Sequence, residues 1–187
     1  MATYTYDVFM TLDGYGAGDV EGYWGKQGPE LLAHRALQYE ADQLMVFGAR
    51  TYREMAAILA EWSDPDLWVA RMCAHPLVVP SKTLNPADVN AVWPDTSVVA
   101  EDAVELVTRL KAESSVPLRS HGSVAMNRSL MAAGLVDVLQ VTVFPMITGR
   151  IGAAPVFRQF ADFDLELIES HVLDGRSIEL RYRPTPL

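Results

Sequence analysis

Two short apolar runs constrain the fold more than any other feature of the sequence. The first, Gln43–Phe47, ends at Gly48, and the second, Pro76–Val79, ends at Pro80. Each run has the length of a strand and is too short for a buried helix. Because both runs are apolar at nearly every position, they predict strands of a sheet that is covered on both faces.

Helical patterns alternate with these strands. The segment Glu101–Ser114 carries apolar residues at helical spacing, and Gly134 is a suitable residue to end a helix. Asp174-Gly175 is a hairpin signal between the last two strands. The expected strands cover 4–11, 43–47, 76–79, 97–99, 117–120, 138–145, 164–172 and 177–183, and the expected helices cover 51–59, 101–114, 123–133 and a segment that begins at Pro29. This order predicts a largely parallel sheet with helices on both faces and an antiparallel hairpin at one edge.

Length and charge narrow the possible functions. The 187 residues carry 15 basic and 24 acidic side chains, a net charge of −9, and we expect one domain over 1–187. An acidic chain is a poor partner for nucleic acid or for an anionic membrane, and no apolar run is long enough to span one. The single cysteine, Cys73, fits a reducing compartment and an inert packing role. The N-terminus has no secretory pattern, so we expect a cytoplasmic protein.

Several familiar motifs are not met. The glycines of 14–18 break the spacing of a G-x-G-x-x-G fingerprint, and Gly25-Lys26 is followed by Gln27 where a P-loop needs a hydroxyl group. The four histidines lie far apart in the sequence and lack a metal-binding spacing, so we expect no metal site.

Three strand-to-helix junctions carry more information. They are 48–51 (Gly-Ala-Arg-Thr), 81–83 (Ser-Lys-Thr) and 121–125 (His-Gly-Ser-Val-Ala). Backbone N–H groups at the start of a helix, with Arg or Lys beside them, favour an anion. Such junctions gather at the carboxyl edge of an α/β sheet, where ligands bind. A single junction of this kind is more often an ordinary cap or turn, but the three together predict a ligand with several phosphates.

In this order the motifs resemble the dihydrofolate reductase superfamily, and more closely its branch of riboflavin-biosynthesis reductase C-terminal domains and their stand-alone bacterial relatives. The resemblance rests on Gly48–Tyr52, Ser81–Leu84, His121–Ser123, Gly134–Leu139, Thr11–Gly14, Pro145–Gly149 and Arg181–Arg183. It covers nearly the whole chain. It implies an α/β, dihydrofolate reductase-like fold, which is a three-layer αβα sandwich with a mixed, mostly parallel sheet and a C-terminal antiparallel hairpin.

The resemblance also implies NADPH, bound in extended form. On the adenosine and pyrophosphate side it places Gly48, Arg50 and Thr51. At the adenosine ribose and its 2′-phosphate it places Ser81, Lys82 and Thr83. Pyrophosphate-binding N–H groups are assigned to Gly122, Ser123, Val124 and Ala125, and the neighbours of the nicotinamide are Leu12 and Asp13. Arg50 and Lys82 are suitable donors for a phosphate monoester on chemical grounds alone.

The catalytic candidates are Asp13 and His121. Asp13 is either a proton donor or substrate anchor, or a turn residue; His121 is either a proton donor near neutral pH or a structural histidine. Tyr15, Trp24 and Tyr52 are candidates for stacking on a planar substrate, although Tyr52 alternatively packs its helix into the core. The glycine-rich loop around Tyr15 and Trp24 is either a lid or a connector.

The sequence departs from the family pattern at four points. Ala49 stands where an arginine is frequent, which bears on the preference for NADPH over NADH, and Lys82 replaces a common arginine. Leu32 occupies the position of the carboxylate with which dihydrofolate reductases hold the pterin ring. The motifs of a zinc deaminase are absent from the sequence.

The leading hypothesis is an NADPH-dependent reductase that transfers hydride to a C=N or C=O carbon of a small heterocyclic substrate, similar to a riboflavin precursor or a pterin. The alternatives are an NADPH-binding protein without turnover and a true dihydrofolate or pterin reductase. Relatives of this branch commonly pair, and the last strand carries apolar Ile178 and Leu180, so we expect a homodimer.

Overall fold

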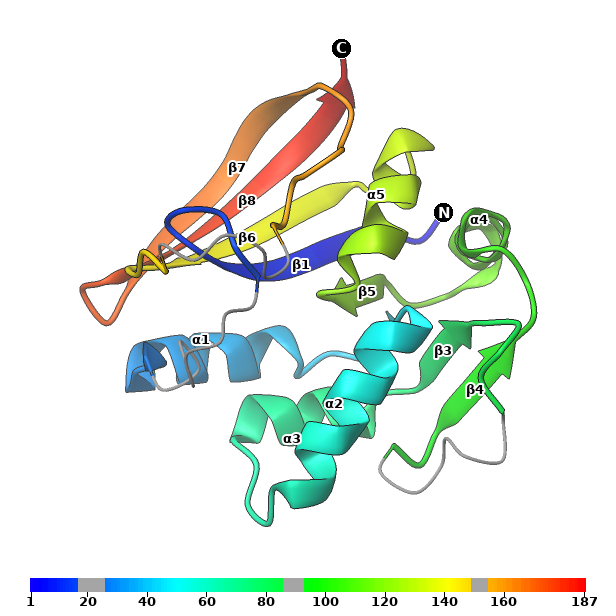
Figure 1. The fold of residues 1–187 in the computed structure, drawn as a ribbon, viewed down its shortest axis with the longest axis horizontal. Helices are drawn as coiled ribbons and strands as arrows, with labels where there is room; N and C mark the ends of the chain where they lie inside the picture. Colours follow the sequence, from blue (N-terminus) through cyan, green and yellow to red (C-terminus); the bar gives the residue numbers. More distant parts are fainter. Residues whose placement is uncertain (17–25, 86–92, 149–154) are drawn as a thin grey trace.

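A computed structural model describes residues 1–16, 26–85, 93–148 and 155–187, and these residues build one eight-stranded sheet between two layers of helices (Figure 1). The strands are β1 (Tyr4–Thr11), β2 (Leu44–Val46), β3 (Leu77–Pro80), β4 (Thr96–Val99), β5 (Leu118–His121), β6 (Val138–Phe144), β7 (Phe163–Leu173) and β8 (Ser177–Pro186). The helices are α1 (Pro29–Gln38), α2 (Ala49–Glu61), α3 (Leu67–Ala74), α4 (Ala103–Glu113) and α5 (Val124–Ala132).

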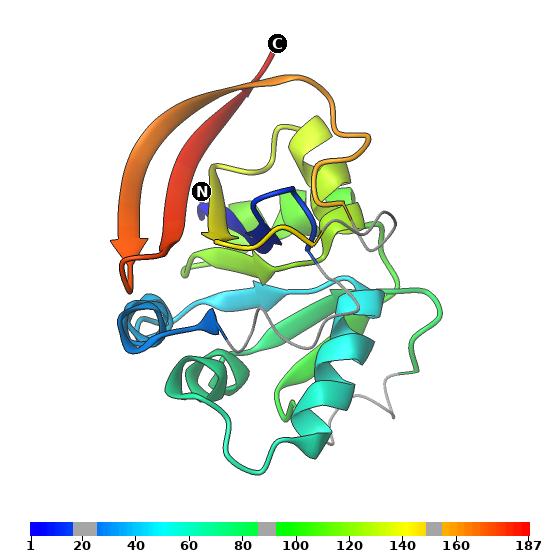
Figure 2. The same cartoon turned by 60° about the vertical axis from the view of Figure 1, so that its left-hand side comes forward.

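The sheet has the strand order β4-β3-β2-β5-β1-β6-β8-β7. Neighbouring strands from β4 to β6 run parallel, whereas β8 pairs antiparallel with both β6 and β7. The hairpin turn contains Asp174 and Gly175 with φ of 54° and 63°. Two consecutive residues with positive φ suit the right-handed twist of a hairpin, so this prediction is confirmed. Figure 2 shows the hairpin curving away from the parallel strands.

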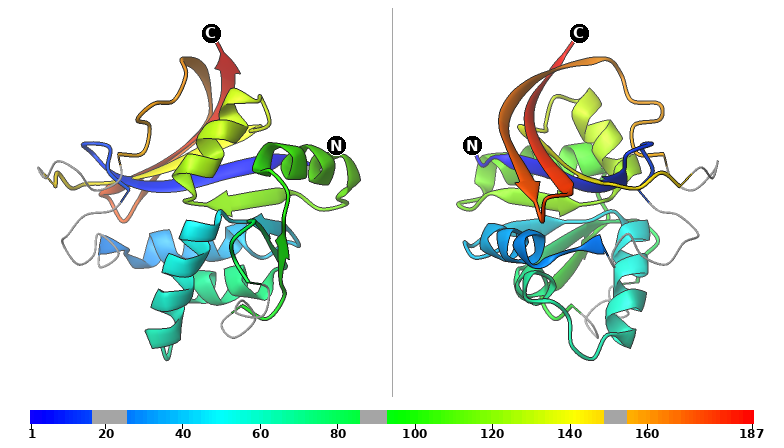
Figure 3. Two further views of the ribbon diagram at one scale, coloured as in Figure 1. Left: turned by 45° about the vertical axis from the view of Figure 1, so that its right-hand side comes forward. Right: turned by 90° about the vertical axis from the view of Figure 1, so that its left-hand side faces the viewer.

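The helices cover both faces of the sheet, as predicted (Figure 3). Residues of α1, α2 and α3 share one core cluster with strand residues that include Phe9 and Met45. Residues of α4 and α5 share the other cluster with Tyr4, Tyr6 and Val8. Because side chains alternate along a strand, β1 supplies both cores at once. The three-layer αβα sandwich is therefore confirmed.

Helix α3 was not anticipated from the sequence. Its buried residues Trp68, Val69 and Met72 form a short apolar stripe that packs on α1 and the sheet. The helix has only eight residues and no side-chain cap, so its local signal is weak. Cys73 lies on this helix, and burial raises the pKa of its thiol to about 11. A thiol with this pKa is unreactive at neutral pH, which agrees with a packing role.

The start of α1 is capped by the tip of the distant hairpin. Gly28 has no side chain to offer, and the Asp174 carboxylate instead accepts hydrogen bonds from the N–H groups of Glu30 (2.8 Å) and Leu31 (3.0 Å). The Glu30 carboxylate in turn accepts from the N–H of Asp174 at 2.6 Å. A Cβ on Gly28 would lie 2.3 Å from Cγ of Asp174, so only glycine allows this approach. The contact fixes α1 against the end of the sheet.

No helix in the described ranges is both long enough and apolar enough to cross a bilayer.

Candidate functional site

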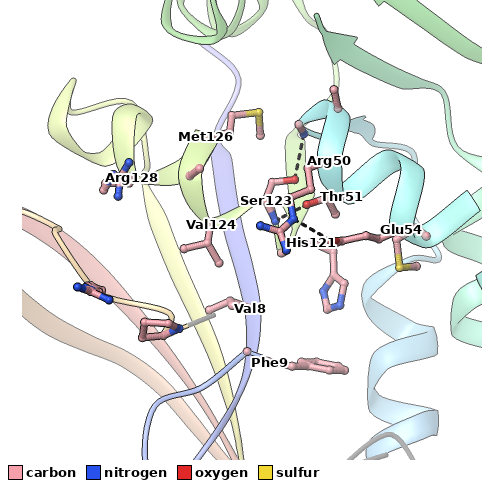
Figure 4. Close-up of a pocket in the computed structure, with 18 of the residues that line it drawn as sticks. Val8, Phe9, Arg50, Thr51, Glu54, His121, Ser123, Val124, Met126 and Arg128 are labelled. Carbon is pink, nitrogen blue, oxygen red and sulfur yellow. Dashed lines mark hydrogen bonds and ion pairs between the residues drawn. The ribbon is translucent and has the colours of Figure 1, made fainter. Parts of the chain in front are cut away.

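A cleft opens where the carboxyl ends of β2 and β5 meet the N-termini of α2 and α5 (Figure 4). Its volume is about 730 Å³. A second hollow of about 430 Å³ lies at the end of β3 and shares Gly48 and Met126 with the first. The two hollows together form a groove along the carboxyl edge of the sheet, the usual ligand position in such folds.

Two predicted residues, Thr51 and Ser123, join the helix starts to each other. Ser123 Oγ accepts a hydrogen bond from the N–H of Gly48 at 3.0 Å, and the N–H of Ser123 donates to Thr51 Oγ1 at 3.1 Å. Figure 4 shows these side chains pointing toward one another. Gly122 and Ser123 both have positive φ, 70° and 52°, which turns the chain sharply from β5 into α5. The hydroxyl groups thus align the two helices.

The buried side chain of Asn127 also stabilises the junction between β5 and α5. Its Nδ2 donates to the carbonyl of Gly122 at 2.9 Å and to Ser120 Oγ at 2.8 Å, while its Oδ1 accepts from the Tyr4 hydroxyl at 3.0 Å. Three partners from two strands and one turn therefore fix the start of α5. The first-turn N–H groups of α5 and α2 have no acceptor within their helices and line the cleft with positive helix ends.

Three arginines border the cleft: Arg50, Arg128 and Arg158. Arg50 is 86% exposed and its Nε donates to Glu54 Oε1 at 2.8 Å. Arg128 donates to the Gln159 side chain at 2.9 Å. Glu54 is the one acidic residue among the described residues that line the cleft, so three cations beside two helix N-termini favour an anion there in a chain of net charge −9.

Arg50 was predicted from the sequence, whereas Arg128 and Arg158 were not. Arg128 lies four residues after Val124 and so shares its helix face, a spacing that was available in the sequence. Arg158 reaches the cleft from the segment after β6, which is brought there by a bridge between Tyr15 and Pro155. No local pattern indicates that contact.

The junction after β3 contributes Ser81 and Lys82 to the second hollow. Glu101 and Asp102, which directly precede α4, line the same hollow. Ser81 Oγ accepts from the N–H of Thr83 (3.2 Å) and of Leu84 (3.0 Å), so it acts as a turn cap. The Thr83 side chain is exposed and outside the residues that line this hollow.

His121 lines the cleft but is almost fully buried, beside Phe9 at 4.7 Å between ring centroids. Its Nδ1 lies 3.2 Å from Asp7 Oδ2 on the neighbouring strand. Burial lowers the pKa of His121, Arg35 and Arg119 lower it further, and Asp7 partly opposes this. The imidazole is therefore neutral at pH 7, which makes it a better proton acceptor than donor.

The group behind His121 was missed by the sequence analysis. Asp7, Arg35 and Arg119 are all buried, and both arginines contact Asp7 Oδ2. Despite the cost of burial, Arg35 and Arg119 hold the pKa of Asp7 well below its usual range. Glu179 of β8 also belongs to this group, because its Oε2 accepts a hydrogen bond from Nε2 of Gln140 at 2.9 Å. We call the four charged residues Asp7, Arg35, Arg119 and Glu179 the buried charge network.

The remaining predicted residues lie outside the cleft or the described ranges. Asp13 accepts hydrogen bonds from Thr11 Oγ1 (2.6 Å) and from the N–H of Thr148 (3.1 Å), which is the turn role considered for it. Leu12 is 64% exposed and its N–H donates to Met146. Trp24 falls among the residues that the structure does not describe, as does most of the glycine-rich loop.

Tyr15 and Tyr52 do not line the cleft as described. Tyr15 pairs with Pro155 in a short bridge at its border. Tyr52 is 4% exposed and packs in the core beneath α2. Consecutive side chains of a helix point in different directions, so Tyr52 faces the core although its neighbour Thr51 lines the cleft. The stacking role for Tyr52 is thus replaced by the packing role.

Within the described residues, no group of three or more His, Cys, Asp or Glu side chains is placed to hold a metal ion.

Solved structures with the same fold include three bacterial proteins. A putative riboflavin biosynthesis protein from Shewanella sp. PV-4 has a TM-score of 0.73 at 20% identity over 99% of both chains. A pyrimidine reductase-like protein from Corynebacterium diphtheriae has a TM-score of 0.64 at 14% identity over 100% of this chain and 93% of the other. A diaminohydroxyphosphoribosylaminopyrimidine deaminase/5-amino-6-(5-phosphoribosylamino)uracil reductase from Thermotoga maritima has 0.63 at 13%, over 98% of this chain and 57% of the other.

These identities are low, so the likeness concerns the fold. Curated protein sequences gave no match. The sequence pattern of the RibD C-terminal domain, however, matches residues 2–177, almost the entire chain. The chain therefore belongs to the RibD C-terminal domain family.

Proposed function

We propose that this protein is a reductase that uses NADPH to transfer hydride to a C=N or C=O carbon of a small heterocycle related to a riboflavin precursor. Membership of the RibD C-terminal domain family supports an oxidoreductase. A structural neighbour with 13% identity is named a 5-amino-6-(5-phosphoribosylamino)uracil reductase, which suggests an aminopyrimidine as the substrate class.

One observation carries the proposal: two helix N-termini and three arginines converge on one cleft in an acidic protein. The donors fit the pyrophosphate of a dinucleotide, because backbone N–H groups and guanidinium groups both bind phosphate oxygens well. Val8, Phe9 and Met55 also line this cleft, and their apolar side chains offer a surface for a planar ring. NADPH supplies the hydride when bound, and the protein orients the reactants and excludes water.

Calorimetric titration with NADPH and NADH at fixed salt tests the cofactor assignment. We expect binding of NADPH, weaker binding of NADH, and a loss of affinity in Arg158→Ala. Arg53→Ala is the matched control, since Arg53 is an exposed residue of α2 that lies outside the cleft lining. Failure of both cofactors to bind the wild-type protein would contradict the proposal.

Oxidation of NADPH with a panel of substrates then tests the chemistry. The panel contains a phosphoribosylaminopyrimidine, its dephosphorylated form, and dihydrofolate. We expect turnover with an aminopyrimidine. Turnover with dihydrofolate alone would favour a pterin reductase, and binding without any turnover would favour a non-catalytic dinucleotide-binding protein.

We also propose a homodimer that uses the C-terminal hairpin. Its edge strand β7 leaves Leu167 53% exposed and Val172 68% exposed, and Ile178 on β8 is 42% exposed. An exposed apolar edge strand of this length is a site for pairing with another chain. Light scattering at micromolar concentration should give twice the chain mass, and a monomeric mass would contradict the proposal.

A further inference from the structure

The contact between Asp7 and His121 joins the buried charge network, to which Asp7 belongs, to the cleft, which His121 lines. The two residues are register partners on the parallel strands β1 and β5. The carbonyl of Asp7 also accepts a hydrogen bond from the N–H of Gly122 at 2.8 Å. Both the main chain and the side chain of Asp7 therefore hold the junction at which His121 enters the cleft.

The protonation state of Asp7 follows from its surroundings. The Asp7 side chain is fully buried, and the guanidinium groups of Arg35 and Arg119 both contact its Oδ2, the latter at 3.3 Å. Tyr39 contributes a hydroxyl group 3.4 Å from the same oxygen, and Glu179 lies 3.7 Å from Arg35 on the far side. A carboxyl group facing two buried cations remains ionised, and an ionised carboxylate can only accept hydrogen bonds.

An acceptor at Asp7 determines which nitrogen of His121 carries the proton. Asp7 Oδ2 lies 3.2 Å from Nδ1, whereas Arg35 Nη2, the alternative partner, lies 3.4 Å away. Arg35 Nη2 is more closely bonded to Asp7 and also lies 3.2 Å from the Tyr39 hydroxyl. The shorter contact requires a proton on Nδ1, which leaves the lone pair of the neutral ring on Nε2.

We propose that Asp7 is a positioning residue that holds His121 as the Nδ1-protonated tautomer where this side chain lines the cleft. The single lone pair of the neutral ring then lies on Nε2, so Nε2 accepts a hydrogen bond and does not donate one. This inference does not rest on the proposed function.

Long-range ¹H–¹⁵N correlation spectra of the uniformly labelled protein at neutral pH report histidine tautomers directly. The signals of His121 are assigned by their loss in His121→Gln. We expect the Nδ1-protonated, neutral form in the wild-type protein. An Nε2-protonated or a doubly protonated His121 would overturn the proposal, and this measurement requires no variant of Asp7 to fold.

Asp7→Asn supplies the second arm of the experiment. The amide can donate to Nδ1, so we expect the tautomer to change to Nε2–H in molecules that retain the native circular dichroism spectrum. The control is Asp137→Asn, because Asp137 is also paired with a cation, Lys111, and bonds to β1 through the N–H of Tyr4. We expect Asp137→Asn to leave the tautomer of His121 unchanged. A folded Asp7→Asn protein with the wild-type tautomer would contradict the positioning role.

Titration with NADPH separates this inference from the proposed function. If the tautomer is as expected but no dinucleotide binds, the proposed function fails and the role of Asp7 stands. If NADPH binds and His121 is protonated on Nε2, the proposed function stands and the role of Asp7 fails.

Discussion

The cleft and the buried charge network meet at His121, yet the arginines of the two regions have different surroundings. Arg35 has no exposed side-chain surface and is bonded to Asp7, whereas the side chain of Arg50 is 86% exposed and pairs with Glu54. A buried guanidinium has lost its water and depends on its carboxylate partners. An exposed one keeps its water and can exchange a weak partner for a ligand.

This difference assigns separate tasks to the two regions. The buried charge network keeps α1 on the sheet and orients His121, while the cleft arginines are available to an incoming anion. His121 is the residue that touches both regions, since it lines the cleft and contacts Asp7. Substitutions in the network should therefore reduce stability, and substitutions at the cleft should reduce ligand affinity.

The largest effect is expected from Arg35→Met. The substitution keeps an apolar stem but removes one of the two arginines that contact Asp7 and also removes a cation from beside Glu179. Loss of one partner from a buried pair costs about 3–5 kcal/mol of the free energy of unfolding. Urea denaturation followed by circular dichroism measures this change.

Arg183→Ala is the control for Arg35→Met. Arg183 pairs with Glu166, and both side chains are more than half exposed, at 59% and 65%. Its loss should cost less than about 1 kcal/mol. Equal destabilisation by the two substitutions would show that burial does not distinguish the two kinds of ion pair.

A smaller effect is expected from Arg50→Ala, and on affinity rather than stability. If Arg50 binds the phosphate that NADH lacks, its loss should weaken NADPH by about 1.5 kcal/mol, the low end for a hydrogen bond between charged groups. NADH should be affected less. Calorimetry at fixed salt measures both, and an equal loss for the two cofactors would remove Arg50 from the 2′-phosphate.

The two regions also differ in how far the sequence predicts them. The cleft is built on strand–turn–helix junctions, and residues such as Gly48, Thr51 and Ser123 lie within a few positions of one another or of a strand end. Local patterns therefore predict them. The pairing of Asp7 with Arg35 and His121 joins residues 28 and 114 positions apart, and no local rule relates them.

Helical phase explains part of what the sequence left open or did not indicate. Arg35 lies on the buried side of α1 with Leu31 and Ala36, where its charge would ordinarily suggest a solvated position. Tyr52 lies beside Thr51 in the sequence but on the core side of α2. For Arg35 the residue type suggests the solvated face and tertiary packing selects the buried one, whereas for Tyr52 packing selects one of the two roles that the sequence had left open.

Acidification should weaken the buried region before the cleft. In the unfolded chain His121 binds a proton near its ordinary pKa of 6.5, but burial lowers the pKa in the folded protein. The unfolded state thus binds more protons, and the free energy of unfolding decreases as the pH falls below 6.5. The lowered pKa of Asp7 adds a further loss below its ordinary value of 3.8.

Urea midpoints measured across this pH range test the assignment, with His121→Gln as the matched variant. The variant should show a shallower loss of stability just below pH 6.5. Stability that increases on acidification through this range would contradict a neutral, buried His121. A profile identical to that of the wild-type protein would assign the effect to another histidine.

The smallest effect is expected from Glu54→Gln at the rim of the cleft. Glu54 pairs with Arg50 four residues earlier on α2, and an exposed pair of this kind contributes about 0.3–0.5 kcal/mol to stability. Removing the carboxylate also removes a competitor for the guanidinium, so NADPH should bind slightly more tightly while the urea midpoint falls slightly. Tighter NADPH binding together with a lower urea midpoint would show that Arg50 contributes more to ligand binding than to stability. A loss of NADPH affinity would instead mean that Glu54 is needed to orient Arg50, and that the rim, like the interior, relies on preset ion pairs.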